Sequence, residues 1–440
     1  MSLTPLVLLG LLDLSRIIVL GLAVCALLSW RTERASTVFL IGLVGNACQV
    51  PLFGMLARQG GGPTAVATTW LLIWLAAGIV VWRRRGSEGS RFSSRRLLLP
   101  TVGALLALAV AAFVLANDYR AGNLLDADAW VFWGLRGQLI FEYGLASPEL
   151  WQVMHPDYPL LLPLLNACAD FLFGASGEIP TLLTAYVLAF IALFSLSESL
   201  VSVAGARAAV AVPTLFVLAP VPMFAINPRV LLAGYAEAWS ILFVALVCAY
   251  RPVSRKQPLS LDESVVLLVI SLLKNEGLLF AALYVAARIF LQLGGAPAGA
   301  AAARTTLFRA GLALFPGLFW LGLVRASGSG SHYDFFALPS AAKLGESAVA
   351  LADFCRDLPW LFWFVPVILV LLPISGGAWE RWILFHAAAF YGLLAAVVFS
   401  FHGSTRLVLE NSFHRLHWPL LLLALIAAAK MAERPFRVRP

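Results

Sequence analysis

The chain contains little charge for its length. Of its 440 residues, 12% are charged and 61% are apolar, whereas roughly a quarter of the residues in a soluble domain are charged. The longest polar stretches are about 40 residues, too short to fold alone without disulfides or metals. The composition therefore excludes a soluble domain of any size and predicts an all-α integral membrane protein.

Paired cysteines and nucleotide-binding motifs are absent as well. None of the five cysteines belongs to a CxxC pair, so neither a disulfide framework nor a thiolate metal site is indicated. The sequence has no GxxxxGK(S/T) loop, no HExxH and no GxSxG. An enzyme that works outside the cytosol, without access to cytosolic nucleotides, needs an activated donor that arrives through the membrane. Sugar on a polyprenyl phosphate is the commonest such donor.

What the chain does contain is a series of apolar segments from Leu6 to Ala429. One membrane span needs roughly 20 residues, so there is room for about eleven to thirteen spans. Basic residues cluster at segment ends, in the stretches 83–96, 251–256 and 434–439. This is the pattern of cytoplasmic loops, so the net charge of +8 does not indicate a nucleic-acid-binding surface.

The basic stretch 83–96 predicts the topology of the N-terminal part. Three spans, at about 6–29, 36–57 and 66–82, precede it, which places the N-terminus outside. A fourth span at about 97–117 then runs outward and delivers the following residues to the external face.

Three external loops follow from counting in both directions, at 118–158, 326–358 and 402–416. The middle of the chain does not fit this count, because four apolar segments between Tyr158 and Tyr250 would put the basic stretch after them outside. We therefore expect that one of those four segments does not cross the membrane fully.

The first external loop carries candidate catalytic residues. Asp126 and Asp128 precede residues 129–144, a tryptophan-rich stretch with few charges that suits a helix at the level of the lipid headgroups. Two carboxylates two residues apart do not share a helix face. We expect them on an extended turn, where they deprotonate an acceptor or bind a divalent cation. The alternative is that one of them only caps the following helix.

The same loop ends in a stiff turn, formed by His155, Pro156, Asp157, Tyr158 and Pro159 in succession. The prolines hold this segment extended and fix where its side chains point. A histidine and an aspartate on such a turn at a membrane entrance suit contact with a phosphate or a hydroxyl group. Alternatively, the turn merely orients the helix that follows.

The apolar stretch 264–290 is interrupted by charge and glycine at Lys274, Asn275, Glu276 and Gly277. It forms either one long helix or two half-helices that meet within the membrane. A charge at the bilayer centre costs roughly 2.5–3.5 kcal/mol. Because Lys274 and Glu276 are two residues apart, they are not expected to pair along one helix face. Each then needs its own partner, from a ligand or from a structural ion pair.

Further candidates lie at the start of one apolar segment and before the last span. Glu237 opens an apolar segment and, like Lys274 and Glu276, needs a partner from a ligand or from a structural ion pair. His414 and Arg415 precede the final apolar segment. Arginine at that depth suits a lipid phosphate, because its fork binds two oxygens, or serves as an interfacial anchor. Five of the six histidines lie in or beside the external loops, where polar residues are in any case tolerated: His155, His332, His402, His414 and His417.

In their order along the chain, these motifs resemble the GT-C superfamily of polytopic glycosyltransferases. That superfamily includes the protein O-mannosyltransferases and the aminoarabinose transferases of lipid A. The resemblance is closest to its bacterial branch similar to dolichyl-phosphate-mannose–protein mannosyltransferases. It covers about residues 97–432 and rests on the acidic first loop, the HPDYP turn, a GYAD-like segment with Glu237 in place of Asp, the KNEG break and Arg415. It implies that one external-loop aspartate, Asp128 or Asp126, activates the acceptor hydroxyl.

The expected fold is a polytopic helical bundle of GT-C type, with interfacial helices in the first large external loop. Residues 1–96 would be accessory transmembrane helices and a basic cytoplasmic loop, 97–432 the catalytic core, and 433–440 a basic cytoplasmic tail. The expected activity is inverting transfer of a sugar from a polyprenyl-phosphate donor to an acceptor hydroxyl on a glycan, lipid or protein. It would take place at the periplasmic face of a bacterial inner membrane.

In this mechanism Asp128 or Asp126 is the catalytic base, and the charges of Lys274, His155 and Arg415 help the lipid phosphate to leave. The residues that would bind the sugar or orient those groups are Asp157, Tyr158, Glu237, Glu276 and His414. A divalent cation at Asp126 and Asp128 is compatible with the chemistry and not required by it. The alternatives are a transporter or flippase of lipid-linked saccharides, with charges along a central path, and a ligase that joins a finished glycan to a lipid.

Overall fold

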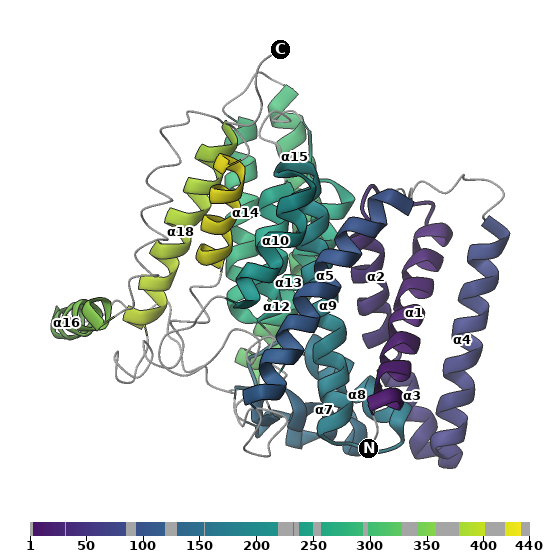
Figure 1. Ribbon diagram of the computed structural model, residues 1–440. Helices are drawn as coiled ribbons and strands as arrows, with labels where there is room; N and C mark the ends of the chain where they lie inside the picture. Colours follow the sequence, from purple (N-terminus) through teal and green to yellow (C-terminus); the bar gives the residue numbers. More distant parts are fainter. Residues whose placement is uncertain are drawn as a thin grey trace.

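All secondary structure in the described part of this computed structural model is helical (Figure 1). The structure describes residues 3–30, 32–84, 94–118, 130–153, 155–218, 232, 237–249, 257–293, 298–327, 341–357, 378–400 and 419–432. Within these residues the all-α prediction is confirmed. Five helical segments are long and apolar enough to cross a membrane, and they are joined by shorter apolar helices.

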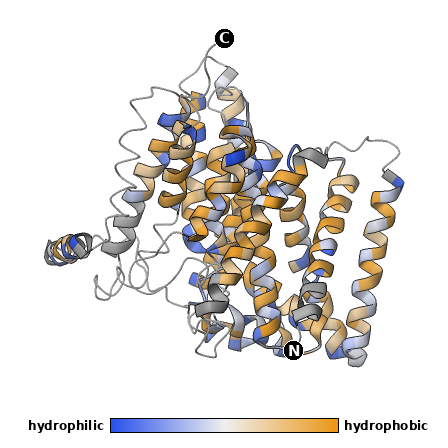
Figure 2. Ribbon diagram, viewed as in Figure 1, coloured by the Kyte–Doolittle hydropathy of each residue, from blue (hydrophilic) through white to orange (hydrophobic). Residues whose placement is uncertain are grey.

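The outer surfaces of these helices are apolar as well as their packed faces (Figure 2). Leu72 is 60% exposed, Phe113 71% and Phe290 78%. Large exposed apolar surfaces of this extent are unusual for a protein surrounded by water. They are what helices in contact with lipid require.

The N-terminal part forms a small group of helices beside the rest of the bundle. It comprises α1 (Leu3–Leu27), α2 (Ala35–Ala47), α3 (Val50–Leu56), the π-helical turn η1 (Ala57–Gly61) and α4 (Gly62–Arg84). Glycines bring α1 and α2 into close contact, since a Cβ on Gly21 would lie 1.9 Å from the carbonyl oxygen of Val38. Small residues permit such close packing between helices in a membrane.

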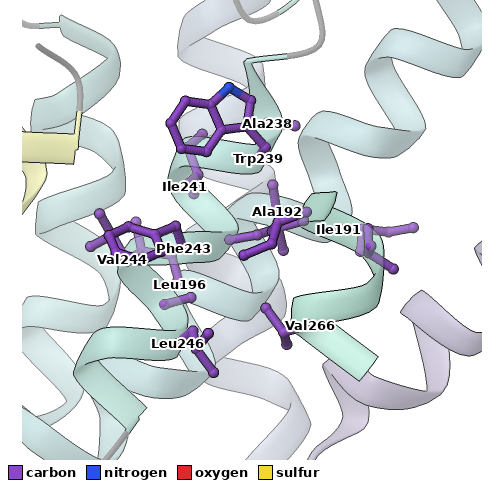
Figure 3. Close-up of a cluster of buried hydrophobic side chains, with 14 of the residues drawn as sticks. Ile191, Ala192, Leu196, Ala238, Trp239, Ile241, Phe243, Val244, Leu246 and Val266 are labelled. Atoms are coloured by element: carbon purple, nitrogen blue, oxygen red, sulfur yellow. The ribbon is translucent and has the colours of Figure 1, made fainter. Parts of the chain in front are cut away.

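The core of the bundle is an apolar cluster to which several helices contribute. The helices concerned are α5 (Ser94–Asp118), α9 (Glu178–Val203), α10 (Gly205–Leu218), α12 (Ala238–Ala249) and α13 (Leu261–Leu273). Figure 3 shows side chains of α9, α12 and α13 interleaved there, among them Leu196, Phe243 and Val266. This packing holds α12 at the centre of the fold, where 11 of its 12 residues are buried.

The interrupted stretch 264–290 forms a helical hairpin, so the two-helix alternative is the observed one. After α13 the backbone is extended at Lys274 (φ −158°, ψ 152°), and α14 (Asn275–Leu293) starts at the next residue. The two helices run antiparallel, because Glu263 near the start of α13 pairs with Arg288 near the end of α14. Gly277 packs against the carbonyl of Ile270 at the reversal.

The bundle has two distinct ends, here named after Figure 1. The upper end contains the link between α1 and α2, the end of α9 and the start of α13. Hydrogen bonds join them: the Glu198 carboxylate accepts from the amide of Ala35 (2.8 Å), and the Asp262 carboxylate from that of Glu33 (3.2 Å). The lower end contains the first turn of α1 and the reversal after α13 (Figure 1).

Each of the three basic stretches of the sequence is flanked by helices that end or begin at the upper end (Figure 1). They follow α4, α12 and the last helix, Pro419–Ala432. The start of α18 (Ala378–Ser400) lies there too, since Trp382 donates to the carbonyl of Val247 in α12 (3.1 Å).

The short apolar helix α8 (Leu161–Phe173) lies at the lower end. Its C-cap, Gly174, is left-handed, and a Cβ added there would lie 3.4 Å from Pro63 at the start of α4. The side chain of Asn166 donates a hydrogen bond to the carbonyl of Trp133. Among the described residues between Tyr158 and Tyr250, α9, α10 and α12 run along the bundle, whereas α8 lies at its lower end (Figure 1).

The remaining described helices lie at the lower end, along the bundle and across it. At the lower end lie the π-helical turn η2 (Trp130–Gly134), α7 (Leu135–Tyr143) and the 3₁₀ helix η3 (Pro148–Trp151). The long α15 (Ala298–Ala326) packs along α13 and α14. The amphipathic α16 (Ala341–Asp357) lies across the direction of the other helices and is seen end-on in Figure 1.

Candidate functional site

The turn predicted from the HPDYP sequence lies at the lower end, between η3 and α8. His155 has a left-handed backbone (φ 54°), and its carbonyl accepts a hydrogen bond from the amide of Tyr158 (3.1 Å). The carbonyl of Tyr158 in turn accepts from Arg136 Nη1 in α7 (2.9 Å) and from Trp320 Nε1 in α15 (3.0 Å). Two helices distant in sequence therefore hold the turn in one conformation.

Aromatic rings fix the side chains of this turn. The Tyr158 ring stacks between Trp133, with centroids 5.1 Å apart, and His155, with centroids 4.9 Å apart. Phe132 meets the His155 ring edge-on at 4.8 Å. The imidazole of His155 is thus oriented, with its Nδ1 3.9 Å from Oδ1 of Asp157.

Asp157 connects the turn to the helical hairpin. Its Oδ2 accepts a hydrogen bond from Nδ2 of Asn275 at 2.8 Å, across 118 residues of sequence. Asp157 is buried, and Asn275 is the first residue of α14. The break in the hairpin and the HPDYP turn therefore form one site.

Lys274 is the cation at the centre of this site. Its Nζ lies 2.9 Å from Oε1 of Glu237, which directly precedes α12, and 3.7 Å from Oε1 of Glu276. The three side chains are 8%, 3% and 10% exposed. The Lys274 ammonium also lies over the Tyr158 ring, 5.9 Å from its centroid.

The prediction that Lys274 and Glu276 cannot pair is wrong. It assumed that both residues belong to one helix, where side chains two apart point in different directions. Lys274 is instead extended, and only Glu276 lies in the first turn of α14. The break in the helix is what turns the two side chains toward each other.

Negative charge is in excess among the described residues of this site. The carboxylates of Glu237 and Glu276 face Lys274, and that of Asp157 accepts a hydrogen bond from the neighbouring Asn275. Arg136 lies behind the turn, where it donates to the carbonyl of Tyr158. Burial lowers the pKa of Arg136 to about 10, while the charge of Asp157 acts in the opposite direction. Arg136 therefore remains a cation at neutral pH and partly offsets the acidic side chains.

The first turn of α14 contains buried acceptor atoms that have no hydrogen-bond donor among the described groups. They are Oε2 of Glu276 and Oδ1 of Asn275, on neighbouring residues. Leaving a buried acceptor without a donor is costly, more so for a charged one. The site is thus prepared to accept hydrogen bonds from a group that carries donors.

The structure brings together the predicted site residues that it describes: His155, Asp157, Tyr158, Glu237, Lys274 and Glu276. The predicted catalytic residues Asp126 and Asp128, and the predicted substrate-binding residues His414 and Arg415, lie outside the described residues. The described chain resumes at Trp130, in the turn that leads to Trp133.

Sequence reasoning missed two residues that position the turn, Arg136 and Trp320. Arg136 had a signal, since it is the single charged residue between Asp128 and Glu142. Full burial of an arginine in such a stretch requires partners. Trp320 had no signal, because its role depends on how α15 packs against the turn.

Within the described residues, no group of three or more His, Cys, Asp or Glu side chains is placed to hold a metal ion. The cation site predicted at Asp126 and Asp128 lies outside those residues. The carboxylates around Lys274 already have the lysine ammonium as their counter-ion.

Neither a protein-family model, nor a curated protein sequence, nor a solved structure matches this chain.

Proposed function

We propose that this chain is a membrane glycosyltransferase of GT-C type, which transfers a sugar from a polyprenyl-phosphate donor to an acceptor hydroxyl with inversion. The observation that carries the proposal is the convergence at the lower end. The HPDYP turn, Glu237 and the Lys274–Glu276 break come from distant segments and form one buried polar site. Buried clusters of charged side chains of this kind are often found at functional sites.

The side of the membrane follows from the distribution of basic residues. The basic stretches of the sequence adjoin the upper end, and such stretches are retained in the cytoplasm. The site at the lower end would then face outside, which in a bacterium is the periplasm. A donor carried by a membrane lipid reaches that face without a nucleotide.

The residues take different roles in this proposal. Asp128 or Asp126, both close in sequence to η2, would remove the proton from the acceptor hydroxyl. Lys274 is already bound by two carboxylates, so its contribution is to hold Glu237 and Glu276 in place for the sugar. The departing lipid phosphate would then depend on His155 and on Arg415 for positive charge. A divalent cation at Asp126 and Asp128 remains part of the proposal.

A transporter or flippase of lipid-linked saccharides is the alternative from another class. It needs polar groups along a path through the bundle. Among the described residues, the charges at the lower end are separated from those at the upper end, such as Glu263 and Arg288, by the apolar cluster of α9, α12 and α13 (Figure 3). This separation supports an enzyme whose chemistry takes place at one end.

The proposal is tested with purified protein in lipid vesicles, supplied with radiolabelled polyprenyl-phosphate sugars and an extract of envelope acceptors. We expect transfer by the unchanged protein and a loss of roughly 10²–10⁴ in rate for at least one of Asp126→Asn and Asp128→Asn, with donor binding retained. Asp353→Asn, on the exposed side of α16, is the matched control and should transfer normally.

The outcomes separate the candidate functions. A flippase gives no transfer in this assay and instead moves labelled lipid between leaflets. A ligase transfers only a preassembled glycan to a lipid and leaves single-sugar donors unused. Normal transfer by both Asn variants would remove these aspartates from the mechanism. Mass spectrometry of envelope glycans from cells with and without the gene identifies the product.

A further inference from the structure

The first turn of α14 presents hydrogen-bond acceptors that nothing described in the protein satisfies. Oε2 of Glu276 and Oδ1 of Asn275 are buried without a donor, although the other polar atom of each side chain is engaged. Oε1 of Glu276 lies 3.7 Å from Lys274, and Nδ2 of Asn275 donates to Asp157. Those engagements fix both side chains, so the two free oxygens are fixed with them.

A ligand that fits these two oxygens must bring donors. Carboxylate oxygens only accept hydrogen bonds, and so does the amide oxygen of an asparagine. Sugar hydroxyls donate, and two neighbouring hydroxyls of one ring present donors to adjacent acceptors. A phosphate or carboxylate group offers acceptors and negative charge and fits neither oxygen.

The charge of the site also favours a ligand without a negative charge. The free oxygen of Glu276 belongs to a buried carboxylate, and the Glu237 carboxylate contacts the same Lys274 ammonium. A carboxylate on a ligand near Glu276 would meet a buried like charge, and like charges brought together in an interface are strongly unfavourable. Such repulsion is a common means of excluding a wrong ligand.

We propose that Glu276 and Asn275 form the sugar subsite of this protein, and that this subsite accepts sugars without an acidic substituent and excludes uronic acids. The inference rests on the proposed function for the identity of the ligand as a sugar. It goes further in naming the residues that contact the sugar and the class of sugar that they bind.

The test is direct binding to the purified full chain in detergent, measured by saturation-transfer difference NMR, which detects weak ligands. The probes are the methyl glycosides of glucose, galactose and mannose, each paired with its methyl uronide, which replaces the CH₂OH group with a carboxylate. We expect at least one neutral glycoside to bind, and its uronide to bind at least about tenfold more weakly. Binding by none of the neutral glycosides, or equal binding of the uronides, overturns the proposal.

Two variants assign the selectivity to a residue. Glu276→Gln removes the charge and keeps the shape. We therefore expect weaker binding of the neutral glycoside and a smaller difference in affinity between that glycoside and its uronide (the affinity gap). Glu142→Gln makes the same change on an exposed side chain of α7 at the same end and should leave the gap unchanged. An unchanged gap in folded Glu276→Gln contradicts the assignment. If that variant does not fold, the comparison of each glycoside with its uronide on the unchanged protein still tests whether the subsite excludes uronic acids.

The two proposals fail in different ways. Selective binding of neutral glycosides without sugar transfer would remove the glycosyltransferase and keep the sugar subsite. Sugar transfer from a polyprenyl-phosphate uronic acid at the rate of the neutral sugar would keep the enzyme and refute the subsite.

Discussion

Replacement of Lys274 by methionine tests the arrangement at the centre of the site. The side chain keeps its length and loses its charge, so the buried carboxylates of Glu237 and Glu276 lose their contact with the Lys274 ammonium. At an effective dielectric constant of about 20, Coulomb's law gives about 6 kcal/mol for the contact with Glu237 and about 4.5 kcal/mol for that with Glu276.

Those attractions are not the expected loss, because desolvation of all the charges opposes them. Removing one partner of a buried ion pair typically costs about 3–5 kcal/mol. The side chains of Lys274 and Glu237 are 8% and 3% exposed, so solvent screens the pair little. We therefore expect Lys274→Met to destabilise the protein by about 3–5 kcal/mol.

The assay is thermal unfolding of the purified protein in detergent, followed by intrinsic tryptophan fluorescence. Lys343→Met is the control, since Lys343 pairs with the exposed Glu346 on α16, and it should cost less than about 1 kcal/mol. The double variant Lys274→Met with Glu237→Gln should recover part of the loss, because one stranded carboxylate is then neutral. An unchanged midpoint for Lys274→Met, or no recovery in the double variant, would refute the ion bridge.

Two further predictions concern the hairpin and the topology. Gly277→Ala places a Cβ 2.1 Å from the carbonyl oxygen of Ile270 and should destabilise the protein by about 1–3 kcal/mol. Gly311→Ala, where the new Cβ has no neighbouring atom within 4 Å, is the control and should not destabilise it. Equal thermal-unfolding midpoints for the two variants would contradict the close packing at Gly277. In protein whose native cysteines are replaced, a cysteine at the exposed position Gln152 should react with a membrane-impermeant thiol reagent from outside, and one at Ser90 should not. The reverse labelling would place the site in the cytoplasm.

Much of the architecture follows from local patterns in the sequence. Apolar runs long enough for a membrane identify most of the long helices, because a helix in lipid must satisfy its own backbone and expose apolar side chains. Charge and glycine at Lys274–Gly277 marked the break, and the prolines around Asp157 marked the turn. These are short-range effects, which depend on neighbouring residues alone.

The tertiary structure decided what the charged residues do. Lys274 meets Glu237 across 37 residues and Asn275 meets Asp157 across 118, and no periodicity predicts contacts between such distant segments. The sequence determined that a helix breaks at Lys274. Only the packing of α12, α14 and the turn determined that this lysine is neutralised within the protein, because a buried ammonium must find its counter-charge wherever the fold places one.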